Sequence, residues 1–210
     1  KAAAFPVNAW LPASYHAIPP GLSALMAGLL TKLALYALIR TLIFVLPATF
    51  LVLQPLLLVV AIATMILGPL GAIAETHTRR ALGFILIGGI GVTMAGLALP
   101  SEAAMSGAIL YIIHAMLTLT ALYLLAGLAE GGDTDTPAQP GLSGVAAAAF
   151  LLVILSVSGV PPFLGFWPKL LLLQGILRDA AIVHSPAIDP RGVALAAAII
   201  LNAFLTLFAG

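Results

Sequence analysis

The chain has 210 residues, of which 62% are hydrophobic and 7% are charged, and its mean hydropathy is +1.21. Soluble globular domains carry about 25% charged residues, so this composition excludes a soluble domain and indicates an all-α integral membrane protein. The net charge of +1 excludes a basic nucleic-acid-binding surface, and the absence of cysteine excludes disulfides and cysteine nucleophiles. Because the chain opens on Lys1 with an apolar run and no Met, we expect a fragment that lacks helices before Lys1 and after Gly210.

Apolar runs separated by polar or Pro-rich turns predict a partial chain of about seven membrane helices. In chain order, the predicted helical segments are residues 1–10, 21–45, 50–74, 81–99, 107–129, 144–177 and 192–210. The first is expected to be the end of a helix that Pro6 kinks or breaks. Loops are predicted over residues 11–20, 75–80, 100–106, 130–143 and 178–191, and the composition of 130–143 indicates a mobile loop.

One predicted helix is interrupted in its middle. Gly159, Val160, Pro161 and Pro162 divide the apolar segment 144–177 into two halves. Two adjacent prolines remove two backbone donors and fix φ, so a regular helix is not expected to continue through them. Transporters use discontinuous helices of this kind to bring backbone dipoles and water to the middle of the membrane, and we expect the same arrangement here.

Three lysines are expected deep inside the membrane. Lys32 lies eleven residues from the start of its helix at Gly21, or about 16 Å at the rise of an α-helix, which places it near the middle of a bilayer core about 30 Å thick. Lys169 lies nine residues from Arg178, about 14 Å from the membrane edge, and Lys1 is similarly far from the loop that follows it. A lysine side chain is too short to reach the headgroups from that depth, so each lysine should face a protein interior or a wet cavity.

Lysines that are buried and joined by water are suited to carry protons, because desolvation disfavours the charged form of an amine. No acidic residue is predicted to lie equally deep. His114 is a further relay candidate in the middle of its predicted helix, and Thr118 and Thr120 could hold relay water. Two structural alternatives stay open: each lysine could pair with a carboxylate outside this chain, and His114 could be a hydrogen-bonded core residue. No residue pattern predicts a cofactor, a metal-ligand set or covalent catalysis.

Four motifs together resemble one family of membrane proteins. Residues 1–40 contain K-A-A-A-F-P-x-x-x-W-L-P-x-x-Y-H-A-x-P-P followed by A-L-x-A-G-L-L-T-K-x-x-x-Y-A-L-I-R. The other motifs are G-A-I-A-x-x-x-x-R-R at residues 71–80, Y-I-I-H at 111–114 and G-V-P-P-F-L-G-F-W-P-K-L at 159–170. These motifs resemble the antiporter-like subunits shared by respiratory complex I and the Mrp cation/proton antiporters, and the likeness is closest to the D-type subunits of the Mrp antiporters.

The resemblance implies a fold of fourteen helices with two inverted repeats, each holding a broken helix and buried lysines. This chain would form a single transmembrane domain from the end of helix seven through helix thirteen. The end of the first repeat would occupy about residues 1–46, and the second repeat about residues 50–210. The matching lysines of helices seven, eight and twelve would be Lys1, Lys32 and Lys169. The helix breaks would fall at Pro6, Pro161 and Pro162.

The resemblance also implies a function. It is that of a secondary transporter rather than an enzyme: a subunit of a multi-subunit Na⁺(K⁺)/H⁺ antiporter that moves protons along buried lysines and water. Its partners would be other membrane subunits, protons, Na⁺ and the lipid bilayer of the cell inner (plasma) membrane, and no nucleic acid. One alternative is a proton-pumping subunit of a complex I-type NADH:quinone oxidoreductase or a membrane hydrogenase. Another is a membrane scaffold whose proton path has decayed.

The chain departs from the family pattern between Lys32 and Lys169. Leu119, or Thr118 if the register shifts by one, stands where the family usually has a lysine in helix eleven. The other departures are Ala115 in place of a second histidine, Ile85, Gly88 and Gly89 in place of polar residues, and His77 in place of an acidic residue. We expect water beside the glycines to bridge this gap.

Overall fold

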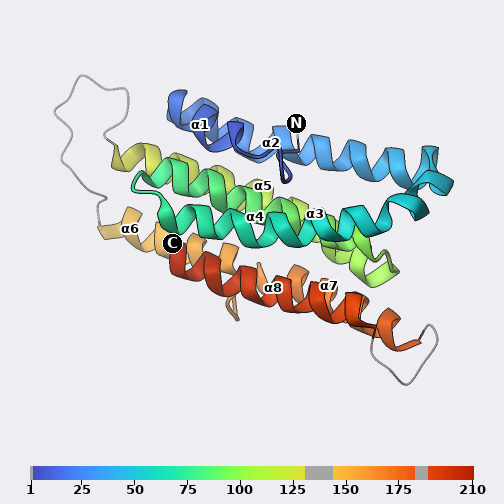
Figure 1. Ribbon diagram of the computed structural model, residues 1–210. Helices are drawn as coiled ribbons and strands as arrows, with labels where there is room; N and C mark the ends of the chain where they lie inside the picture. The colour runs from blue at the N-terminus through green and yellow to red at the C-terminus, as the bar shows by residue number, and fades with distance from the viewer. Residues whose placement is uncertain (1, 131–143, 183–188) are drawn as a thin grey trace.

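The structure, a computed structural model, describes residues 2–130, 144–182 and 189–210. Its elements are α1 (Trp10–Ala17), α2 (Pro20–Arg40), the π-helical turn η1 (Thr41–Val45), α3 (Pro47–Ala74), α4 (Thr78–Ala98), α5 (Glu102–Ala129), α6 (Gly144–Ser158), α7 (Phe166–Ile182) and α8 (Pro190–Ala209). The long helices run side by side along the molecule (Figure 1). Over the described residues the fold contains helices and turns but no strand, so the predicted all-α class is confirmed.

Among the described residues, five helical segments are long and apolar enough to cross a membrane, namely Pro20–Val45, Pro47–Ala74, Thr78–Ala98, Glu102–Ala129 and Pro190–Ala209. The first of them joins α2 and η1 into one continuous span. Two shorter helices, α6 and α7, together replace the interrupted helix predicted over residues 144–177. This set of helices is that of an integral, multi-pass membrane protein, as the composition predicts.

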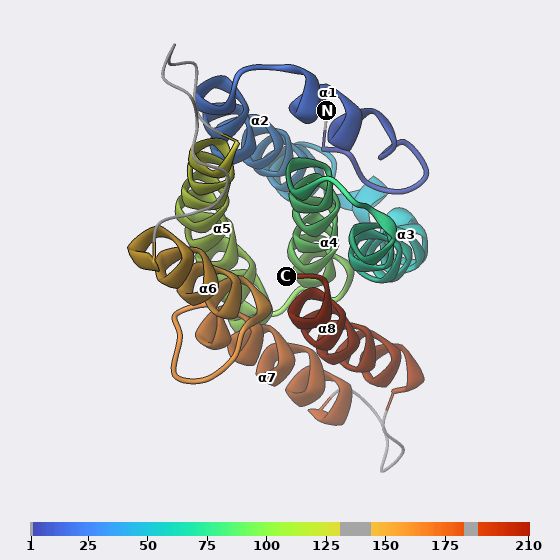
Figure 2. The ribbon, with the colours of Figure 1, turned by 90° about the vertical axis from the view of Figure 1, so that its left-hand side faces the viewer.

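The helix α4 lies at the centre of the bundle, between α2 and α5 on one side and α3 and α8 on the other (Figure 2). Its most apolar stretch is 83% buried, compared with 28–39% for the other four spans. Glycine makes this packing possible, because Gly68 of α3 rests against the backbone of Gly88. Asn202 of α8 joins the same core and donates a hydrogen bond of 2.8 Å to the Met65 carbonyl oxygen of α3. The glycines of the helix predicted over residues 81–99 therefore serve close packing.

The N-terminal segment corrects the sequence prediction. Residues 2–9 form turns and irregular backbone rather than the end of a helix, and α1 begins at Trp10 and extends through most of the segment 11–20 predicted as a loop. Pro12 is the third residue of α1, a position at which a backbone nitrogen has no partner within the helix, so the proline ring is tolerated there. Pro6 lies in this irregular stretch, so the backbone around it is non-helical and does not form a kinked helix.

Other boundaries differ by a few residues. Helix α5 begins at Glu102 instead of residue 107, because the Ser101 hydroxyl caps it by accepting the Ala104 N–H at 3.1 Å. Helices α3 and α4 begin three residues before the predicted positions, and α7 continues to Ile182, into the predicted loop over 178–191. Most of the predicted loops over 130–143 and 178–191 lies outside the described residues. The division into two inverted repeats stays a prediction.

Candidate functional site

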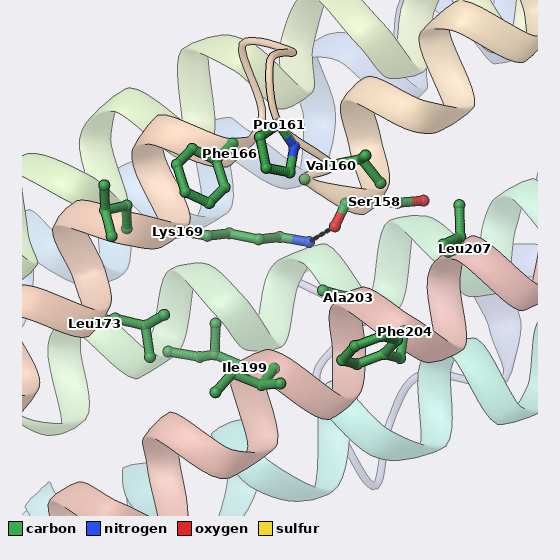
Figure 3. Close-up of a pocket in the computed structure, with 13 residues that line it drawn as sticks. Ser158, Val160, Pro161, Phe166, Lys169, Leu173, Ile199, Ala203, Phe204 and Leu207 are labelled. Atoms are coloured by element: carbon green, nitrogen blue, oxygen red, sulfur yellow. Dashed lines mark hydrogen bonds between the residues drawn. The ribbon is translucent and has the colours of Figure 1, made fainter.

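The helix interruption predicted at residues 159–162 is present. Helix α6 ends at Ser158, and α7 begins at Phe166 (Figure 3). Residues 159–165 form turns between the two helices, and Gly159 has a φ of +84°, which glycine adopts without strain. The last carbonyl groups of an α-helix have no helical partner, so the break presents free acceptors in the interior of the bundle.

Lys169 supplies a donor to these acceptors. It is the fourth residue of α7, and its side chain is buried, with an exposed fraction of 5%. Its Nζ donates to the Ser158 carbonyl oxygen at 2.8 Å (Figure 3). The same Nζ donates to the Val157 carbonyl oxygen at 3.2 Å. The C-terminal end of a helix carries partial negative charge. The Lys169 ammonium therefore stabilises the end of α6 and fixes the two half-helices relative to each other.

A pocket of about 430 Å³ opens beside this lysine, between the helix break and α8. Its lining is apolar apart from Lys169 and Ser158, and α8 contributes Ile199, Phe204 and Leu207 (Figure 3). Lys169 is the charged residue among those that line the pocket, and its ammonium group lies at the edge of the pocket and points towards Ser158 (Figure 3). The lysine thus lies between a polar helix end and an apolar space.

His114 of α5 lies on the other side of the same break. It is buried, with an exposed fraction of 4%, and its Nε2 is 2.9 Å from the Ser156 hydroxyl oxygen of α6. Its Nδ1 has no hydrogen-bond partner among the described residues. The Tyr111 ring lies on the same helix with its centroid 6.1 Å from that of His114, and His114 is close enough to Lys169 for their charges to interact. The structure thus brings two of the predicted site residues together.

Lys32 of α2 is also buried, with an exposed fraction of 5%, and its Nζ donates to the Ala27 carbonyl oxygen at 2.5 Å. A cavity of about 10 Å³ lies beside it, which is about the space that one water molecule needs. Helices α4 and α5 close this cavity with Gly89, Ile90, Thr93, Ala115 and Leu119. Three of the residues at which the chain departs from the family pattern, Gly89, Ala115 and Leu119, therefore line the cavity beside Lys32.

Neither buried lysine has a carboxylate partner in the part of the chain that the structure describes. The two ion pairs recorded there join Arg79 to Glu130 at 2.7 Å and Arg80 to Glu75 at 3.8 Å. All four of these residues lie at or next to the ends of α3, α4 and α5. Ionic pairing is thus confined to the helix ends, and both lysine ammonium groups are held by backbone carbonyls.

The N-terminal break is stabilised by a threonine. The Phe5 backbone N–H, next to Pro6, donates to the Thr64 hydroxyl of α3 at 3.0 Å, and the same hydroxyl donates to the Val60 carbonyl oxygen at 2.6 Å. Thr64 is fully buried, so this contact holds irregular backbone inside the bundle. Lys1, the third predicted lysine, lies outside the described residues.

The two threonines predicted as relay residues bond to backbone. The Thr118 hydroxyl donates to the His114 carbonyl oxygen at 2.9 Å. The Thr120 hydroxyl donates to the carbonyl oxygens of Met116 at 2.7 Å and Ala24 at 3.3 Å, and it packs against Gly28 of α2. Thr120 therefore joins α5 to α2, and a relay role for either threonine stays a prediction.

Sequence reasoning missed three hydroxyl groups at the site, those of Thr64, Thr93 and Ser156. A signal for them was present, because polar side chains inside a membrane helix are costly and often functional. The sequence could not reveal their partners. The Ser156–His114 contact joins positions 42 residues apart, and the Phe5–Thr64 contact joins positions 59 apart.

Comparison with known proteins supports the resemblance found in the motifs. The model of the family described as "NADH:quinone oxidoreductase/Mrp antiporter, TM" matches residues 1–187. The D subunit of the Na(+)/H(+) antiporter of Alkalihalophilus pseudofirmus is 34% identical over 194 residues, which are 90% of this chain and 39% of that protein. The protein of the same name from Bacillus subtilis is 36% identical over 182 residues, 83% of this chain and 36% of that protein. The chain thus spans less than two fifths of the length of these curated relatives.

Solved structures give the same result. A chain of the Mrp complex from Dietzia sp. matches 100% of this chain with a TM-score of 0.84 and 31% identity, and 38% of that chain is covered. A chain of respiratory complex I from Thermus thermophilus matches 99% of this chain with a TM-score of 0.79 and 25% identity, and 44% of that chain is covered. The matched family model, the relatives and the shared fold agree, and the chain belongs to the NADH:quinone oxidoreductase/Mrp antiporter transmembrane family.

Proposed function

We propose that this chain is part of a proton-translocating subunit of a multi-subunit Na⁺(K⁺)/H⁺ antiporter in the cell (plasma) membrane. The observation that carries the proposal is a pair of ammonium groups, Lys32 and Lys169, each buried in a separate helix and bound to backbone carbonyls. A lysine amine can exist with or without its additional proton, and a carboxylate partner would fix the charged form. A buried lysine without such a partner is free to exchange its proton.

The family implies a proton route between the two lysines, and the structure supports one that does not need a lysine at position 119. Gly89 lines the Lys32 cavity, and a Cβ on Gly89 would lie 2.9 Å from the Tyr111 hydroxyl oxygen. The Tyr111 and His114 rings lie 6.1 Å apart, and His114 in turn contacts Ser156 beside the helix break that holds Lys169. We propose that the route runs from Lys32 past Gly89 and Tyr111 to His114, Ser156 and Lys169.

In this proposal Lys32 is the central proton carrier and Lys169 acts at the exit or coupling end. Lys1 would receive protons at the N-terminal break, by its match to the family motif. The breaks at Pro6 and at Pro161 and Pro162 admit backbone dipoles and water to the interior. Other membrane subunits, protons, Na⁺ and the lipid bilayer are the proposed partners, and the activity is secondary transport rather than enzymatic turnover.

The likeness to a chain of respiratory complex I supports a second candidate, a proton-pumping subunit of a redox-driven complex. The same lysines would then carry protons, but electron transfer in other subunits would supply the energy. A scaffold with a decayed proton path is the third candidate, since Ala115 and Leu119 make the Lys32 cavity largely apolar.

One experiment distinguishes these candidates. The complete native complex is isolated to identify its subunits, and proton flux is measured in everted membrane vesicles, with and without Na⁺ and with and without a respiratory electron donor. Our proposal predicts flux that Na⁺ triggers after a proton gradient has been established, and copurification with small Mrp subunits. Flux that requires the electron donor, with copurifying iron–sulfur subunits, would support the redox candidate. Flux that persists in an assembled Lys32→Ala complex would support the scaffold.

Substitution of Lys169 separates its structural role from its proposed transport role. In Lys169→Leu, the carbonyls of Val157 and Ser158 lose their donor, and each buried unpaired group costs about 1–3 kcal/mol. We expect this variant to lose Na⁺-dependent proton flux and to yield less intact complex with a lower thermal midpoint.

Lys169→Arg is the matched variant, because arginine retains donors and charge but does not release its proton in proteins. We expect it to restore much of the yield and thermal stability while flux stays absent. If Lys169→Arg restored flux together with stability, Lys169 would be a fixed positive charge that supports the helix break and not a proton carrier.

A further inference from the structure

His114 has two nitrogen atoms in different surroundings. Its Nε2 contacts the Ser156 hydroxyl at 2.9 Å, and its Nδ1 has no partner among the residues that the structure describes. A buried polar atom without a partner is costly and calls for an explanation, of which a role in proton transfer is one. The titratable groups recorded beside His114 are Tyr111 on its own helix and Lys169 on α7, while Lys32 of α2 faces the next turns of α5 at Ala115 and Leu119.

A serine hydroxyl can bond to a histidine ring in both of the ring's charge states. When the neutral ring carries its proton on Nε2, this nitrogen donates to Ser156 Oγ and Nδ1 keeps a free lone pair. When Nδ1 gains a proton, both nitrogens become donors, and Ser156 Oγ still accepts from Nε2. In the tautomer with its proton on Nε2, the unpartnered Nδ1 is the nitrogen that can accept a further proton.

The surroundings hold this contact rigidly. A Cβ on Gly165, in the turn before α7, would overlap the Ser156 carbonyl oxygen and would lie 2.8 Å from His114 Cε1. The turn, α6 and the imidazole therefore pack against one another without spare space. Ser156 is in the last turn of α6, two residues before Ser158, whose carbonyl accepts from Lys169. A substitution of Ser156 would therefore change the hydrogen bonding of His114, where α5 packs against the end of α6.

We propose that Ser156 is a positioning residue for proton transfer: it anchors Nε2 of His114, so that Nδ1 is the nitrogen that takes up and releases the proton. This inference rests on the proposed proton-transport function and adds a residue to it. Protonation at Nδ1 makes the imidazolium, and loss of the same proton restores the neutral ring, while the Nε2–H group stays bonded to Ser156. The hydroxyl keeps the ring in one orientation through the cycle.

The test uses the complete complex with the full-length subunit, and it measures Na⁺-dependent proton flux in everted vesicles over a range of pH. In Ser156→Ala we expect flux to fall about tenfold, which is less than the rate loss typical when a general acid–base group is removed. We also expect the pH dependence of flux to shift, because Nε2 of His114 loses its hydrogen-bond partner. Ser156→Thr keeps the hydroxyl and is expected to restore both flux and profile. Ser23→Ala is the control, since Ser23 is a buried serine that donates to the Pro20 carbonyl oxygen in its own helix at 2.9 Å and does not contact His114.

A double-mutant comparison tests whether Ser156 acts through His114. In a His114→Gln background, adding Ser156→Ala is expected to cause no further loss. The inference is overturned if Ser156→Ala matches Ser23→Ala in flux and pH profile, if Ser156→Thr is as impaired as Ser156→Ala, or if the losses from His114→Gln and Ser156→Ala multiply. Lys32→Ala is measured alongside. If it abolishes flux while Ser156→Ala does not reduce it, the proposed function stands and this inference fails.

Discussion

Gly165→Ala is expected to prevent recovery of a stably folded subunit. The added methyl group would overlap the Ser156 carbonyl oxygen and crowd His114 Cε1 at 2.8 Å. Overpacking of a core typically costs about 1–3 kcal/mol, and the cost here should lie at or above the upper end of that range, because the obstructing atom belongs to helix backbone and cannot rotate away. The measurement is the yield and thermal midpoint of the detergent-solubilised complex.

Gly144→Ala is the control, because Gly144 begins α6, the half-helix against which Gly165 packs, and a Cβ there would meet no atom within 4 Å. We expect this variant to keep the wild-type yield and thermal midpoint. Equal yields for Gly144→Ala and Gly165→Ala would contradict the close packing of the turn before α7 against α6.

Several parts of the fold follow from local chemistry and could be predicted from the sequence. The break before α7 follows from Pro161 and Pro162, which cannot continue a helix. The burial of Lys32 and Lys169 follows from the length of the apolar runs around them and from the cost of placing an ammonium group in lipid. Both lysines are indeed 5% exposed, whereas their transport roles stay predictions.

The contacts that join distant segments could not be predicted. A single sequence does not reveal that Ser156 meets His114, that Thr64 holds the Phe5 backbone or that Leu119 faces Lys32. These contacts depend on helix rotation and on the order of helices in the bundle, which hydropathy leaves open.

Local signals were also misread in two places. The prolines between residues 12 and 20 predicted a loop, but Pro12 occupies the first turn of α1, where proline is tolerated. Ser101 and Glu102 form a helix start with a capping hydroxyl, whereas the apolar pattern, which begins only after them, predicts a loop there. Capping residues would have placed the start of α5 correctly.

The central claim is that a buried lysine carries protons, and Lys32 tests it most directly. Its ammonium is bound to the Ala27 carbonyl oxygen, next to a cavity of about 10 Å³ between α4 and α5. Lys32→Ala removes the amine, and Lys32→Arg keeps a positive charge that is not released in proteins. If Lys32 carries protons, both variants lose transport. If Lys32 is only a fixed structural charge, Lys32→Ala loses transport and Lys32→Arg keeps it.

The measurement is Na⁺-dependent proton flux in everted vesicles that contain the complete complex, with assembly checked in each variant by recovery of the intact complex. Our account predicts that Lys32→Ala and Lys32→Arg both reduce flux at least about 100-fold, within the range typical of a lost acid–base group, while the complex still assembles. Flux at the wild-type level in either assembled variant would contradict the account, because the buried lysine would then be a structural residue and the proton path would lie elsewhere.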